Sequence, residues 1–127
     1  MAIHHKLPIY KSAYELLQLA TKLIQNFHRS IKPSIGKAIQ DACVRVCLLV
    51  AKANAAHDKI PPLDELLEWL KEAELLIRLA MDMKFISIPQ YASSVLLTDA
   101  IGKQAHGWRK ASLPPPSTPA AQQASLL

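Results

Sequence analysis

Nine prolines constrain this chain of 127 residues more than any other feature. Pro8, Pro33, Pro61, Pro62 and Pro89 leave long proline-free stretches between them, and the other four prolines fall within the last fourteen residues. A proline inside a helix loses a hydrogen bond and clashes with the preceding turn. The spacing therefore predicts four helices of similar length, and it argues against β architectures, which need frequent turns.

Apolar residues recur at helical spacing in each proline-free stretch, with half of all residues apolar. The stripes predict helices over about residues 9–27, 33–56, 63–84 and 88–111, with the Pro61-Pro62 pair as a break. The residues Ser87-Ile88-Pro89-Gln90 are typical of a capping box at the start of the last helix. Four helices of about 20 residues joined by short links favour an all-α, antiparallel up-down four-helix bundle.

We expect three regions along the chain. The four-helix bundle spans residues 9–111, after an N-terminal extension of residues 1–8. Residues 112–127 form a disordered, proline-rich tail, because they lack both periodicity and charge.

Charge is unevenly distributed between the two halves. Residues 1–57 hold eight Lys and Arg against two acids, whereas residues 58–99 hold four bases and eight acids. On the first predicted helix, a stripe of cations and amides lies opposite the apolar stripe: Lys11, Gln18, Lys22, Gln25 and Arg29. Such a stripe can follow a phosphate backbone. The alternative is an ordinary solvated helix face.

Some apolar residues point away from the predicted core. Val44 and Leu48 flank Arg45 on the second helix, while Leu75 and Leu79 share the outer face of the third helix with Glu68 and Glu72. Exposed apolar surface usually marks an interface. A basic face and an acidic face on one chain can also pair between copies, and head-to-tail pairing closes a ring when the rotation permits. These seven residues are therefore predicted to lie at an oligomer interface.

The sequence offers no motif for catalysis. Cys43 and Cys47 are one helical turn apart, and even with His57 they lack the four ligands of a structural zinc site, so we expect reduced thiols in the core. Glycine-rich phosphate loops and the Glu-x-x-His pairs of di-iron bundles are absent from the sequence. We expect no enzyme activity, no catalytic residues, no metal and no cofactor. The absence of a signal core or a membrane-length apolar run predicts a cytoplasmic protein without a membrane partner.

Several segments together resemble a known family. They are Pro8-Ile9-Tyr10-Lys11-x-x-Tyr14-Glu15-Leu16-Leu17, Phe27-His28-Arg29, Ile35-Gly36, Lys52-Ala53-Asn54, Leu79-Ala80-Met81-Asp82-Met83-Lys84, Gln90-Tyr91 and Ile101-Gly102-Lys103-Gln104-x-x-Gly107-Trp108. In their order and spacing, over about residues 8–111, they resemble the bacterial four-helix bundle family. That family includes Avd, the accessory variability determinant of diversity-generating retroelements, and the ribosomal RNA intervening-sequence proteins.

The resemblance implies a homopentamer of four-helix bundles with a basic surface for RNA or DNA. By position, that surface would consist of Lys11, Lys22, Arg29, Lys32 and Lys37, and Tyr10, Tyr14, Gly102, Gly107 and Trp108 would be structural. For the Avd branch, the resemblance also implies binding to a retroelement reverse transcriptase. The alternative is a structural or protein-interaction oligomer of the intervening-sequence type, without a nucleic-acid role.

Overall fold

A computed structural model describes residues 3–115, which fold into four long helices. The helices are α1 (Pro8–Gln25), α2 (Lys37–Ala55), α3 (Ile60–Asp82) and α4 (Ile88–Ala111). Single turns precede two of them: a 3-10 turn at His4–Lys6 and a π-helical turn at Lys32–Gly36. No strand occurs in the described residues, so the all-α four-helix prediction is confirmed.

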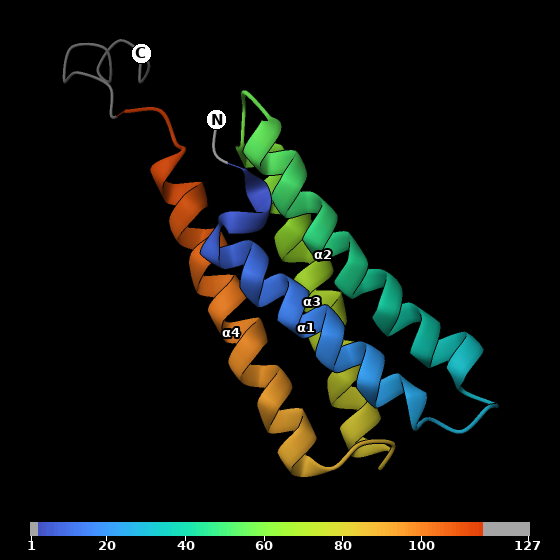
Figure 1. Cartoon of the computed structure of the whole chain (residues 1–127). Helices are drawn as coiled ribbons and strands as arrows, with labels where there is room; N and C mark the ends of the chain where they lie inside the picture. The colour runs from blue at the N-terminus through green and yellow to red at the C-terminus, as the bar shows by residue number, and fades with distance from the viewer. Residues whose placement is uncertain (1–2, 116–127) are drawn as a thin grey trace, which may run out of the picture.

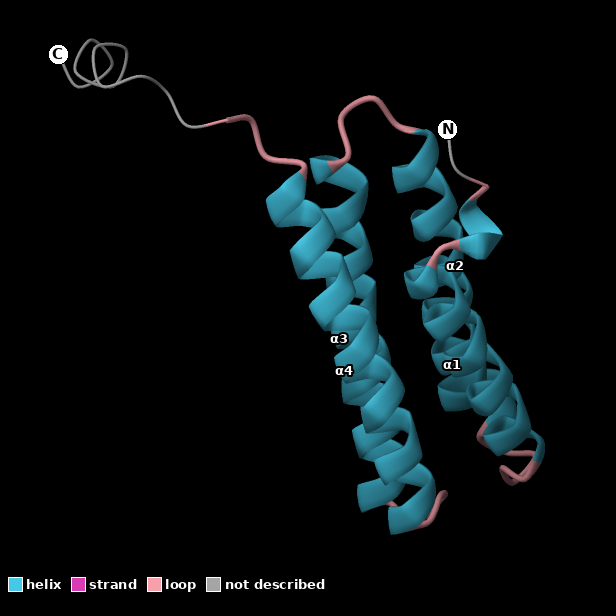
Figure 2. Cartoon of the chain, turned by 60° about the vertical axis from the view of Figure 1, so that its left-hand side comes forward, coloured by secondary structure: helices cyan, strands magenta, loops and turns pink. Residues whose placement is uncertain are grey.

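The helices run alternately up and down the bundle (Figure 1). α1 packs between α2 and α4, and α3 packs against the same two helices. In Figure 2, α3 and α4 form one pair and α1 and α2 the other. This order places the α1–α2 and α3–α4 connections at one end, and the start of α1 and the end of α4 at the other (Figure 1).

One stripe from each helix forms the core. The largest fully buried side chains include Leu16 of α1, Val46 of α2, Leu66 of α3 and Ile101 of α4. Cys43 and Cys47 are buried and free, which confirms the prediction of core thiols. Burial raises the pKa of Cys43 to about 12, with Cys47 as a second cause. Both thiols therefore behave as small apolar side chains.

The predicted break at Pro61-Pro62 is wrong, because α3 begins at Ile60 and includes both prolines in its first turn. The first amides of a helix have no intrahelical partner, so prolines cost little there. Asp58 supplies the missing acceptor, since its carboxylate accepts a hydrogen bond from the Ile60 amide at 3.1 Å. The helix also ends at Asp82, two residues before the predicted end.

The last helix begins where the sequence predicts, but its buried face includes two polar residues outside the predicted apolar stripe. The Ser87 hydroxyl accepts from the Gln90 amide at 3.2 Å, and the Gln90 side chain accepts from the Ser87 amide at 2.8 Å, which confirms the capping box. The apolar stripe expected on this helix misses Ser94 and Thr98, both of which are buried. Their hydroxyls donate to carbonyls three residues earlier at 2.6 and 3.2 Å, so both residues can be buried without an unpaired polar atom.

The structure describes parts of the predicted N-terminal extension and of the predicted proline-rich tail. Pro8, which was assigned to the N-terminal extension, is the first residue of α1. Most of the predicted proline-rich tail, residues 116–127, lies outside the described residues.

Candidate nucleic-acid interface

The five cations expected at a nucleic-acid surface are all exposed and lie along α1 and into α2. Lys11 and Lys22 are on α1, Arg29 is in the connection, Lys32 is in the π-helical turn and Lys37 begins α2. Within residues 3–115, the side chains of the first four make no ion pair or hydrogen bond. These four positive charges are therefore available to an anionic partner.

The fifth cation is partly neutralised. Lys37 Nζ lies 2.7 Å from Asp41 Oδ2, one turn along α2, with both side chains more than half exposed. An exposed pair of this kind contributes little stability, but it lowers the local positive charge. Lys37 is thus the weakest member of the predicted set.

A groove of about 400 Å³ runs beside the cations, between α1 and α2. It is lined by Tyr14, Leu17, Gln18, Thr21, Lys22, Gln25 and Gln40. The Thr21 hydroxyl lies 2.8 Å from the Leu17 carbonyl oxygen and 3.2 Å from Gln40 Oε1. The stripe of cations and amides predicted on the first helix contained Gln18, Lys22 and Gln25. It did not include the aromatic Tyr14, and it could not include Gln40, which lies on α2.

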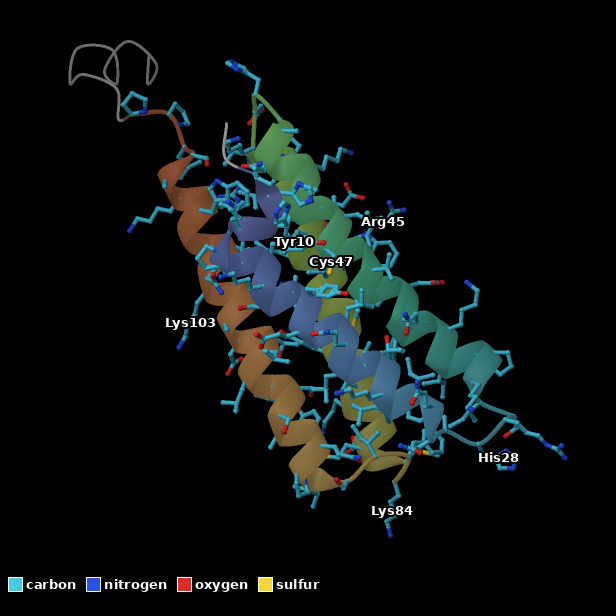
Figure 3. All side chains as sticks on the ribbon, viewed as in Figure 1. Tyr10, His28, Arg45, Cys47, Lys84 and Lys103 are labelled. Carbon is cyan, nitrogen blue, oxygen red and sulfur yellow. The ribbon has the colours of Figure 1, made fainter. Side chains whose placement is uncertain are left out.

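The end of the bundle carries one further cation that the sequence analysis did not assign. Figure 3 shows Lys84 at the same end of the bundle as His28, where the α1–α2 and α3–α4 connections both lie. Arg29 and Lys32, in the first connection, therefore share this end with Lys84. Lys84 is exposed and has a φ of 63°, and it follows the last turn of α3. Its amide and that of Phe85 donate to the carbonyls of Met81 and Ala80, which is a Schellman motif with Lys where Gly is usual.

The residues predicted at an oligomer interface fall into two groups. The first group lies in a groove of about 370 Å³ between α2 and α3, where Val44, Arg45 and Leu48 meet Trp69. The Arg45 guanidinium lies 5.6 Å from the centre of the Trp69 ring. Leu48 is 57% exposed, so this groove has an apolar wall open to solvent.

The second group lies on the outer face of α3. Leu75 is 68% exposed and Leu79 is 39% exposed, and Glu68 and Glu72 are exposed on the same helix. Two further exposed apolar residues lie on α4, Ile88 and Leu96, with exposed fractions of 73% and 74%. The sequence analysis did not assign either of them to a surface. The signal for them was present, since α4 has apolar residues on all sides and not on a single face.

Two of the acidic side chains form ion pairs with arginines of the same chain. Arg109 Nε of α4 lies 2.6 Å from Asp64 Oδ1 of α3, and Arg78 pairs with Asp82 at 3.2 Å. Burial, and then the nearby Asp99, raises the pKa of Glu74. Glu68 and Glu72 make no ion pair among residues 3–115, so they remain open to a partner.

The described part of the chain shows no cluster of three or more His, Cys, Asp or Glu side chains arranged to hold a metal ion. Among the same residues, none of the helices combines the length and apolar character needed to span a bilayer.

A family model described as bAvd-like matches residues 3–112, a range that includes all four helices. The chain belongs to the bAvd-like family. The match confirms the resemblance found in the sequence. A comparison with curated proteins finds no match.

The structure assigns different surroundings to the residues expected to be structural in this bAvd-like chain. Tyr10 and Trp108 are half-buried and pack against the core. Tyr14 is 45% exposed, and a Cβ added at Gly107 would meet no atom within 4 Å. Packing within one bAvd-like chain therefore does not account for Gly107, and it leaves much of the Tyr14 side chain exposed.

Proposed function

We propose that this bAvd-like chain is a non-enzymatic, cytoplasmic, oligomeric bundle that binds RNA or DNA through α1 and the α1–α2 connection. The observation that carries the proposal is the set of unpaired, exposed cations Lys11, Lys22, Arg29 and Lys32 beside an amide-lined groove. Phosphate contacts supply most of the affinity of nucleic-acid binding proteins, and amides contribute hydrogen bonds.

Binding should be strongly salt-dependent, because it releases counterions. Fluorescence anisotropy with labelled RNA and DNA, repeated over a range of salt concentrations, measures this dependence. Lys11→Gln combined with Lys22→Gln should weaken binding and lower the slope of log K against log salt by about 1 per lysine. Lys71→Gln combined with Lys103→Gln, which removes two exposed cations from α3 and α4, is the matched control and should leave the slope unchanged. The proposal is wrong if the wild-type chain binds neither RNA nor DNA at low ionic strength.

The assembly is a second part of the proposal, and the family resemblance suggests a pentamer. It is supported by the exposed Leu75 and Leu79 beside the unpaired Glu68 and Glu72. If the acidic face of α3 pairs with the basic face of a neighbouring copy, Glu68→Lys combined with Glu72→Lys should reduce the mass measured by light scattering. Glu15→Lys combined with Asp99→Lys, at exposed acids on other helices, is the control. An unchanged mass in the α3 variant would rule out this electrostatic pairing.

A function in assembly alone is the second candidate, as in the intervening-sequence branch. The exposed apolar residues of α3 and the Trp69 groove favour it, because neither is needed for phosphate binding. This candidate would be supported if the chain forms an oligomer but binds neither RNA nor DNA at low salt.

The Avd branch adds a protein partner, a retroelement reverse transcriptase. This part of the proposal rests on the family alone. Where a reverse transcriptase is encoded beside this chain, co-expression should yield a complex that survives size-exclusion chromatography. Separate elution of the two proteins would remove this partner from the proposal.

A further inference from the structure

Four residues of α1 follow one another at intervals of four along one face of the helix: Tyr10, Tyr14, Gln18 and Lys22. Residues four apart lie about one turn above each other, so this row places two aromatic rings, an amide and a cation in sequence over about 18 Å. We refer to these four residues as the α1 row. Figure 3 shows its first member, Tyr10, near the end of the bundle where α1 begins.

The two tyrosines form a stacked pair. Their ring planes are inclined by only 15°, with ring centroids 6.2 Å apart. The His4 ring meets the Tyr10 ring edge-on at 5.1 Å, which restrains it from the N-terminal side. Tyr14 remains 45% exposed, so an aromatic surface faces solvent beside the unpaired cations Lys11 and Lys22.

The α1 row leads into the groove between α1 and α2. Gln18, Gln25 and Gln40 line this groove, and each amide carries both hydrogen-bond donors and an acceptor. The Thr21 hydroxyl lies 3.2 Å from the amide oxygen of Gln40, Oε1. The NH2 group of Gln40 is therefore left as a donor. A groove of about 400 Å³ lies within the range of small-ligand sites, and donor–acceptor pairs of this kind match the edges of nucleobases.

We propose that the α1 row and its groove bind single-stranded nucleic acid, with bases stacked on Tyr10 and Tyr14 and phosphates at Lys11 and Lys22. The proposal rests on the proposed nucleic-acid function and names its substrate class. In a duplex, the base faces are covered by their neighbours, so only a single strand can offer them to tyrosine rings. The amides of the groove contact the edge of a base that follows the stacked pair.

The inference predicts a preference for single strands. A labelled oligonucleotide of about 12 nucleotides should bind more tightly than a duplex of the same sequence, both measured by anisotropy at one salt concentration. Tyr14→Leu should weaken single-strand binding roughly 5- to 150-fold, the range found when one base–aromatic stack is removed. Duplex binding should change little, because Lys11 and Lys22 remain.

Two further variants separate stacking from folding. Tyr10→Phe combined with Tyr14→Phe keeps both rings and should retain single-strand binding. Tyr91→Leu removes the third tyrosine of the chain, which lies on α4 beside Arg78, and should have no effect on binding. Circular dichroism checks that each variant is folded.

Two results would overturn the inference while leaving the proposed function intact: tight single-strand binding by folded Tyr14→Leu, or duplex binding at least as tight as single-strand binding by the wild type. A fall in oligomer mass in Tyr14→Leu without a loss of binding would also overturn it, because the ring would then belong to an interface between copies. If the wild type binds neither form, the proposed function fails with it.

Discussion

The ammonium group of Lys59 lies 5.9 Å from the centre of the Trp108 ring, and it joins the end of α2 to the last turns of α4. The same Nζ donates hydrogen bonds to the carbonyls of Ala53, Asn54 and Ala56 at 3.1, 3.2 and 3.0 Å. Carbonyls at the end of a helix have no intrahelical donor and carry the negative end of the helix dipole. Lys59 therefore caps α2 and, through Trp108, connects it to α4.

Replacement of Lys59 by methionine should destabilise the bundle. The substitution keeps an apolar stem against Trp108 but removes the charge and all three hydrogen bonds, at a cost of about 1–3 kcal/mol. Urea unfolding followed by circular dichroism measures the change, with an unchanged m-value as the sign of a pure stability effect. Lys103→Met, at an exposed position on α4, should change the free energy of unfolding by less than about 0.5 kcal/mol. Equal losses in the two variants would contradict a capping function for Lys59.

Ser87→Ala should cost about 1 kcal/mol, because it removes half of the capping box at the start of α4. Ser93 is the matched control, since it is exposed within the same helix and its hydroxyl only donates back to Pro89 at 3.1 Å. Ser93→Ala should be neutral or slightly stabilising, because alanine is the better helix former. In a thermal melt, the midpoint should fall for Ser87→Ala and not for Ser93→Ala. The reverse order would show that the cap does not contribute.

Glycine should have opposite effects at two exposed lysines. At Lys84 the backbone has a φ of 63°, a conformation that costs an L-residue roughly 1 kcal/mol and costs glycine little. Lys84→Gly should therefore raise the free energy of unfolding by about 0.5–1 kcal/mol. Lys103→Gly, within α4, should lower it by about 1 kcal/mol. The two substitutions remove the same charge, so urea titrations of both proteins isolate the backbone effect. A loss of stability at Lys84 would contradict the Schellman geometry.

The buried thiols predict a loss of stability at high pH. Burial raises the pKa of Cys43 from 9.0 to about 12 and that of Cys47 to about 11. As the pH rises above 9, the unfolded chain loses these protons first, so the free energy of unfolding falls. The fall continues up to the folded-state pKa values, by at most about 1.4 kcal/mol per pH unit for each thiol.

Urea titrations between pH 8 and pH 10.5 test this dependence. The fall in stability should be smaller in Cys43→Ala than in the wild type, even though the variant starts from a lower value because of the smaller side chain. The rest of the chain is identical in the two proteins, so the difference between the two pH profiles reports on Cys43. Parallel pH profiles would show that Cys43 ionises as easily in the folded chain as in the unfolded one.

Local rules were sufficient for much of the fold. Proline excludes itself from helix interiors, and a helix that packs on one side needs apolar residues every three or four positions, so the four helices could be predicted from the chain alone. The capping box at Ser87 and Gln90 involves residues three apart, and Cys43 and Cys47 lie within one apolar stripe. Each of these features depends on neighbours in sequence.

The candidate site could be predicted only in part. The unpaired lysines Lys11 and Lys22 share a face of one helix, and helical spacing was enough to find them. Gln40 joins the same groove from α2, and nothing in the local sequence indicates this contact. The stacked arrangement of Tyr10 and Tyr14 also depends on ring orientations that spacing does not determine.

The amino-acid sequence by itself determined that this chain forms four helices, where the first and the last of them begin, and that its positive charge is concentrated in the first half of the chain. The tertiary structure decided what these helices place together: Lys59 with Trp108, and Gln40 with the α1 groove. It also placed Lys84 at the same end of the bundle as the basic α1–α2 connection. It also decided that Ser94 and Thr98 are buried and that Pro61 and Pro62 begin a helix. The physical reason is the range of the interactions, because helix formation depends on residues a few positions apart, whereas these contacts depend on packing between segments distant in the chain.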